Sequence, residues 1–262
     1  MPVVPASQLP RTRYKIPNKI DLSICKSQHV QAPSTCYDAT DLVTILINDS
    51  NPPQKTEMYE VPRELLRWHS SYFAAALDSN SCFKKALGCD LELVEDITVF
   101  DAFYCWVSTG KLRDPPGSPG NADADELYLS PWLLPKIWVF ADMRGIPALA
   151  SAAIDMLHER VFAKWTTAIN LTNFIYEHSP TSCNLRKYIV DLNTKTKSYI
   201  GFKTQMKPEL CPAEFLLEVL PILVRNGESC KSISRQAWTR IDRCQWHDHS
   251  GPGGKLRVAL RK

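Results

Sequence analysis

The residues closest to a chemical motif lie near the C-terminus, where Cys244, His247 and His249 stand within six positions and Cys230 precedes them. Cysteine thiolates and histidine imidazoles are the ligands that zinc prefers in proteins. The spacing, however, matches no regular zinc finger, in which both halves of the site come as close pairs of ligands. We therefore expect no metal or cofactor in a polar, partly disordered C-terminus, and keep zinc at these four residues as the alternative.

A second candidate is the triplet His69-Ser70-Ser71, because a histidine beside a hydroxyl can act as a base for a nucleophile. Adjacent residues on a helix point about 100° apart and do not face each other. The chain also lacks the Gly-x-Ser-x-Gly elbow of serine hydrolases. We interpret the triplet as a corner between two helices, with Ser70 or Ser71 capping the second one.

Other charged groups indicate solvated segments. Asp123, Asp125 and Glu126 lie in a stretch rich in Gly, Pro and Asp, where carboxylates lack the shaped, partly dry site that acid–base catalysis needs. Basic residues at both ends could contact nucleic acid, but neither an aromatic platform nor a recognition helix accompanies them. The basic residues in question are Arg11, Arg13, Lys15, Lys19, Lys255, Arg257, Arg261 and Lys262.

Composition is that of an ordinary globular protein: 262 residues, 44% hydrophobic and 23% charged, with a net charge of +3. That charge is too small for a general nucleic-acid-binding surface. We see neither a secretory signal nor a membrane-spanning run. The nine cysteines show no regular spacing, which indicates reduced thiols. We expect an intracellular protein of the cytoplasm or nucleus, without membrane contact.

The elements that must position these residues are short strands followed by helices. Alternating apolar residues predict a strand over "DLVTILIN", buried on both faces, and an antiparallel partner over "KTEMYEV". Pro62 suits the first position of a helix, and "DLELVED" a third strand. Phe100, Phe103 and Val107 fall on one helix face, with Thr98 as its cap and Gly110 in the left-handed position after its end.

The second half of the chain is predicted to be helical. Residues 113–131 form an exposed loop insertion, and two helices follow, separated by Gly145 and Pro147. Three more amphipathic segments come next, of which Pro212 to Asn226 is the most apolar. We divide the chain into a flexible arm (1–36), a first domain (37–162), a helical extension (163–228) and a flexible basic tail (229–262).

Five short motifs in this order resemble the BTB/POZ domain in its fungal form. They are "DLVTILIN", "VPRELLRWHSSYFAAAL", "LELVED", "FDAFYCWVSTGKL" and "LPKIWVFADMRGIPAL", between Asp41 and Val161. The resemblance implies an α+β fold, a small sheet of three or more strands capped by helices, before the all-helical extension. The family-motif residues include Asp41, Leu65, Leu66, Tyr72, Phe73, Trp106, Gly110, Ala141, Asp142 and Leu149.

Two positions depart from the family pattern. The family's usual histidine before the first helix pair is replaced by Pro62, so the polar contact of that histidine must be absent or replaced. Members that recruit a cullin carry an apolar residue, any residue and then glutamate, whereas this chain has Phe83-Lys84-Lys85. Lysine there reverses the charge at this potential partner contact.

The resemblance implies a non-enzymatic protein-interaction module that forms homo- or hetero-oligomers. A substrate adaptor of a cullin-type ubiquitin ligase is the alternative, and a chromatin- or transcription-associated regulator is a further one. We expect protein partners, with self-association foremost.

Overall fold

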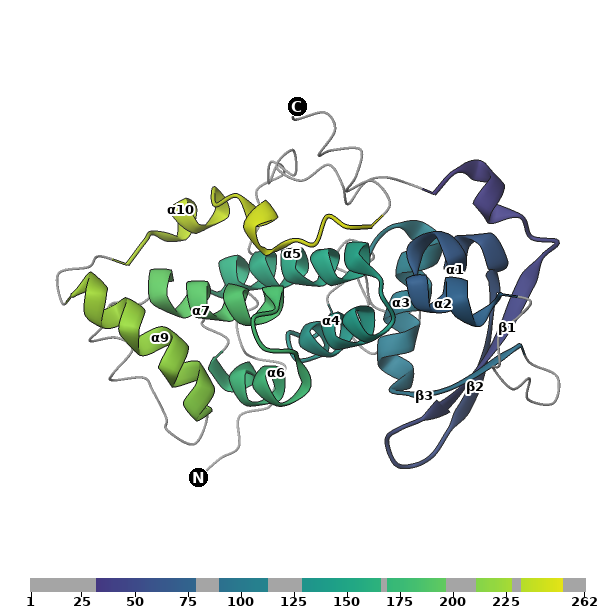
Figure 1. Cartoon of the computed structure of the whole chain (residues 1–262), viewed down its shortest axis with the longest axis horizontal. Helices are drawn as coiled ribbons and strands as arrows, with labels where there is room; N and C mark the ends of the chain where they lie inside the picture. The colour runs from purple at the N-terminus through teal and green to yellow at the C-terminus, as the bar shows by residue number, and fades with distance from the viewer. Residues whose placement is uncertain are drawn as a thin grey trace, which may run out of the picture.

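A computed structural model describes residues 32–78, 90–112, 129–165, 169–196, 211–227 and 232–251. The fold is α+β, with a three-stranded mixed sheet at one end and helices along the rest (Figure 1). In the helical part, α9 lies at the end opposite to the sheet.

The sheet has the order β2-β1-β3. β1 (Leu42–Asp49) pairs antiparallel with β2 (Thr56–Pro62) and parallel with β3 (Leu91–Glu95). Val43, Ile45 and Ile47 point inward and are fully buried, as their alternation predicts. The opposite face of β1 is only partly covered, so the expectation of a strand buried on both faces is wrong.

The helices that follow β2 and β3 pack directly on the inner face of the sheet, and a second helix pair packs behind them. α1 (Arg63–His69) and α2 (Ser71–Ala76) follow β2, α3 (Ile97–Thr109) follows β3, and α4 (Leu133–Met143) pairs with α5 (Pro147–Lys164). Packed phenyl rings join these layers: Phe103 contacts Phe73, Phe100 and Phe140 at centroid distances of 5.3–5.9 Å.

The described parts of the predicted extension are mostly helical. A 3-10 turn, η5 (Ile169–Leu171), precedes α6 (Thr172–His178), and α7 (Asn184–Thr196) and α9 (Ala213–Asn226) follow. Arg186 of α7 is buried and connects these helices. Its guanidinium donates to the carbonyls of Tyr176 and Ser179, at 2.7 and 2.6 Å, and binds Glu214 of α9 at 2.9 Å.

Several helix boundaries differ from the prediction by one or two residues. Pro62 ends β2, and α1 begins at Arg63. Asp96 caps α3, accepting a hydrogen bond from the backbone of Thr98, so Thr98 is not the cap. Gly110 has the predicted left-handed conformation, with φ of 70°.

Both predicted flexible ends contain described structure. Residues 34–37 form the 3-10 turn η4 (Ser34–Tyr37), and Cys36 within it is buried in the core. The expected tail is wrong for residues 232–251, which form α10 (Arg235–Thr239) and η7 (Arg243–Trp246) along α5 (Figure 1). Trp238 and Trp246 hold this segment, because both side chains are fully buried.

Candidate functional site

The His69-Ser70-Ser71 triplet forms the helix corner that its sequence indicates. His69 packs against the edge of Trp106, and burial lowers its pKa to about 4. Ser70, rather than Ser71, caps α2, since its Oγ accepts a hydrogen bond from the backbone N–H of Phe73 at 3.0 Å. The same Oγ donates to the carbonyl of Arg144 at 2.6 Å, which attaches the corner to the turn between α4 and α5.

The family-motif residues divide into a buried and an exposed group. Asp41, Gly110 and Asp142 are exposed, and Tyr72 is half-buried against the guanidinium of Arg144. The residues with buried side chains are Leu65, Leu66, Phe73, Trp106, Ala141 and Leu149. Most of the motif residues therefore serve packing.

Several predicted sites lie outside the described residues. This group contains the Phe83-Lys84-Lys85 triplet, the loop carboxylates Asp123, Asp125 and Glu126, and Cys230. The basic residues singled out at the two ends of the chain also belong to it.

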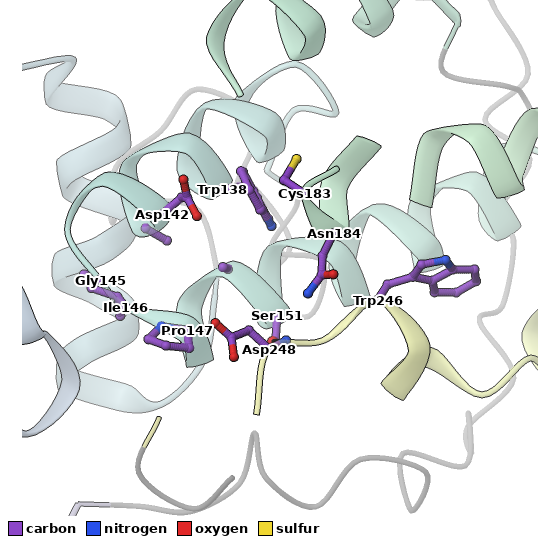
Figure 2. A pocket seen from close by; sticks show the side chains of 12 residues that line it. Trp138, Asp142, Gly145, Ile146, Pro147, Ser151, Cys183, Asn184, Trp246 and Asp248 are labelled. Carbon is purple, nitrogen blue, oxygen red and sulfur yellow. Dashed lines mark hydrogen bonds between the residues drawn. The ribbon is translucent and has the colours of Figure 1, made fainter. Parts of the chain in front are cut away.

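A pocket of about 240 Å³ lies where α4, α5 and the start of α7 meet the C-terminal segment (Figure 2). Asp142 and Asp248 bring two carboxylates to its wall. Although the Asp142 residue is exposed as a whole, partial burial of its carboxylate, followed by the charge of Asp248, raises its pKa. Ser151 and Cys183 also line it, but the Ser151 hydroxyl accepts the N–H of Asp248 and the Cys183 thiol that of Arg186. These side chains therefore contribute to attaching the C-terminal segment and the start of α7.

The structure brings three of the four potential zinc ligands together. Cys244, His247 and His249 each offer a donor atom, and these atoms all lie within 4.8 Å of one another. Asp155 of α5 lies against this cluster, with its Oδ1 atom 3.0 Å from Nε2 of His247. Sequence reasoning missed Asp155, because it stands 92 residues before His247.

A further candidate is an apolar stripe on the outer side of α9, consisting of Leu217, Leu220 and Val224. These side chains are 73%, 39% and 70% exposed. Their spacing of three and four residues places them on one side of the helix. The opposite side of α9 is apolar as well and packs inward through Phe215, Val219 and Leu223.

The outer face of the sheet also exposes apolar side chains, but they alternate with polar ones. Met58 and Val94 are 69% and 67% exposed. Between them Asn48 donates to Glu92 at 2.7 Å and accepts from Thr56 at 3.1 Å. Single exposed apolar residues among hydrogen-bonded polar groups are ordinary on protein surfaces, so the α9 stripe is the stronger candidate for a contact surface.

Comparison with known proteins adds no relative: no protein-family model matches the chain, and no curated protein is similar to it. Within the described ranges, no helix has both the length and the apolar character that a membrane span requires.

Proposed function

We propose that this chain is a non-enzymatic protein-interaction module with a BTB/POZ-like first half, and that it self-associates. The order of elements supports the first part. A hairpin, a helix pair, a parallel third strand, a helix ending at Gly110 and a second helix pair follow one another as the resemblance implies.

The single observation that carries self-association is the exposed apolar stripe of α9. A helix that is apolar on both sides is normally covered on both sides. α9 packs on α6 and α7 through Phe215, Val219 and Leu223, whereas Leu217 and Val224 remain more than two-thirds exposed. Contiguous apolar side chains of this kind mark protein interaction surfaces.

A second copy of this chain suits the stripe because the stripe is self-complementary. Leu217 and Val224 lie at its two ends, and Leu220 lies between them. If two α9 helices pair antiparallel about a two-fold axis near Leu220, Leu217 of each copy faces Val224 of the other. Such a contact uses the same patch on both copies, as dimers with two-fold symmetry do.

The expected affinity is modest. Burying an exposed leucine or valine contributes roughly 1.5–3 kcal/mol, so the two strongly exposed residues on each copy contribute about 4–8 kcal/mol after allowing for their partial burial. Loss of translational and rotational freedom opposes association by about 4–15 kcal/mol. The net gain from the stripe is therefore at most about 4 kcal/mol, and we expect a weak dimer with a dissociation constant of about 1 mM.

Sedimentation velocity of the full chain, from about 10 μM to about 1 mM, tests the proposal at concentrations that reach such a constant. We expect a concentration-dependent dimer that Leu217→Asp abolishes. Met58→Asp is the matched control, since Met58 is equally exposed but lies on β2, and it should leave the dimer intact. A wild-type monomer throughout would refute self-association. A dimer lost with Met58→Asp and kept with Leu217→Asp would refute the stripe.

A further inference from the structure

The C-terminal segment runs along α5 and is fixed at both ends. Near the end of α5, the guanidinium of Arg235 lies 4.7 Å from the ring centroid of Phe162. Near the start of α5, Gly251 lies against Pro147. Between these points Trp238 stacks on His158 of α5, with ring centroids 4.7 Å apart. Packing and hydrogen bonds, such as that from the N–H of Asp248 to the Ser151 hydroxyl, thus hold the segment in place before any metal is considered.

Cys244, His247 and His249 lie in the middle part of this segment. Cys244 is in η7, whose start is capped by Asp242, since Oδ1 of Asp242 accepts the N–H of Cys244 at 2.9 Å. The backbone is extended at His247, with φ of −95° and ψ of 145°. In extended backbone, residues two apart point to the same side, which explains why His247 and His249 turn their rings together. Their centroids lie 5.8 Å apart.

A buried carboxylate orients the middle ligand. The His247 side chain is completely buried, and its Nε2 atom lies 3.0 Å from Oδ1 of Asp155. Arg243 balances the charge of that carboxylate, with Nη1 at 3.1 Å from Oδ1. Histidines that bind metals typically hydrogen-bond a carboxylate through the other ring nitrogen, which fixes the ring orientation. Nδ1 is therefore the nitrogen through which His247 would bind a metal.

We propose that Cys244, His247 and His249 bind one Zn²⁺ ion, with Asp155 as the carboxylate behind His247. One thiolate and two imidazoles suit zinc, whereas calcium and magnesium prefer oxygen ligands. Zn–S bonds of about 2.3 Å and Zn–N bonds of about 2.0–2.1 Å place tetrahedral ligands roughly 3.3–3.8 Å apart. The three donor atoms, within 4.8 Å of one another, need only a small contraction to reach this geometry.

The ion joins the C-terminal segment to α5, because one of its ligands is hydrogen-bonded to α5 through Asp155. Zinc binding should therefore stabilise the native chain by an amount that grows with the logarithm of the zinc concentration once this exceeds the dissociation constant. Three protein ligands also leave a fourth position for water or another donor.

Metal analysis of the purified full chain tests the site. Protein produced in zinc-supplemented medium and kept reduced should contain one zinc per chain, and Cys244→Ser and His249→Ala should each remove most of it. Cys105→Ser is the matched control, because Cys105 is also half-buried but lies on α3. Replacing zinc with cobalt should give a thiolate-to-metal charge-transfer band that Cys244→Ser abolishes.

Thermal unfolding supplies a second readout. Added zinc should raise the midpoint of the metal-free wild type and of Cys105→Ser, and leave that of His249→Ala unchanged. His249 is only half-buried, so this variant tests the site even if Cys244→Ser fails to fold. Folded wild type without stoichiometric zinc and without the cobalt band would overturn the proposal. Full zinc retention by His249→Ala would place the metal elsewhere and overturn it equally.

Discussion

The contact between the Ser70–Ser71 corner and Gly145 gives a sharp prediction for stability. Gly145 has a φ of 58°, in the left-handed region, and its carbonyl accepts the N–H of Ser71 at 3.2 Å. A Cβ atom added at Gly145 would overlap Oγ of Ser71. Gly110 has a similar φ of 70°, but nothing lies within 4 Å of an added Cβ there. Comparing the alanine variants of these two glycines therefore separates the stability cost of backbone strain from the cost of steric overlap.

Gly145→Ala should cost more than Gly110→Ala. The left-handed conformation costs an alanine about 1 kcal/mol at either position. Turning the exposed Ser71 hydroxyl out of the way adds about 0.5–1.5 kcal/mol at Gly145, the cost of a less favourable rotamer. In Gly145→Ala combined with Ser71→Ala, this second cost should disappear, because the two Cβ atoms would lie 3.4 Å apart, close to ordinary contact.

Urea unfolding followed by tryptophan fluorescence measures these free energies. We expect losses of about 1.5–2.5 kcal/mol for Gly145→Ala and about 1 kcal/mol for Gly110→Ala, and a favourable coupling of about 0.5–1.5 kcal/mol between positions 71 and 145. Equal losses for the two glycine variants would show that the Ser71 hydroxyl can move away from the added methyl group at no cost in free energy. Absence of coupling in the double-mutant cycle would refute the overlap itself.

Two further predictions concern buried cationic and titratable groups. Arg186→Lys should destabilise the chain by about 2–4 kcal/mol in the same urea assay, because one ammonium cannot replace the guanidinium contacts to Tyr176, Ser179 and Glu214. Arg225 is exposed, so Arg225→Lys is the control and should leave the stability unchanged. For His69, burial lowers the folded-state pKa to about 4 from 6.5, so its contribution to stability is complete above about pH 6.5 and decreases as the pH falls toward 4. Between pH 6 and pH 5 the wild type should lose about 1 kcal/mol more of its free energy of unfolding than His69→Phe loses. The same pH dependence in both proteins would contradict this assignment.

Elements with strong periodicity could be predicted from the sequence. α7, one of the three amphipathic segments predicted after the second helix pair, has an apolar face over its thirteen residues. Choices between neighbouring residues could not be settled in the same way. Ser70 and Ser71 are both good caps, and what distinguishes them is the carbonyl of Arg144, which is 74 residues away in sequence.

The C-terminal segment shows a different limit. α10 has five residues and η7 has four, which is too short for any helical periodicity to appear. The signal that was available is the pair of tryptophans, Trp238 and Trp246, because a large aromatic side chain seldom remains in water when a core surface is near. That surface, formed by His158 and Tyr188, exists only after α5 and α7 have packed.

The candidate sites were visible in part. The cysteine and histidines of the proposed zinc site could be selected by residue type, but their convergence depends on an extended backbone after η7 and on Asp155. The α9 stripe had a sequence signal as well, since Pro212 to Asn226 is the most apolar segment of the extension. Its excess of apolar residues is more than one buried side of a helix requires.

α5 connects these features into one stability argument. The Arg144–Gly145 turn, just before α5, is hydrogen-bonded to the Ser70–Ser71 corner. The C-terminal segment from Arg235 to Gly251 packs along α5. Removing that segment would expose the His158 and Tyr188 rings that Trp238 and Trp246 now cover. The first half of the chain therefore depends for its stability on residues near the C-terminus, and a metal bound beside Asp155 would strengthen that dependence at the middle of α5.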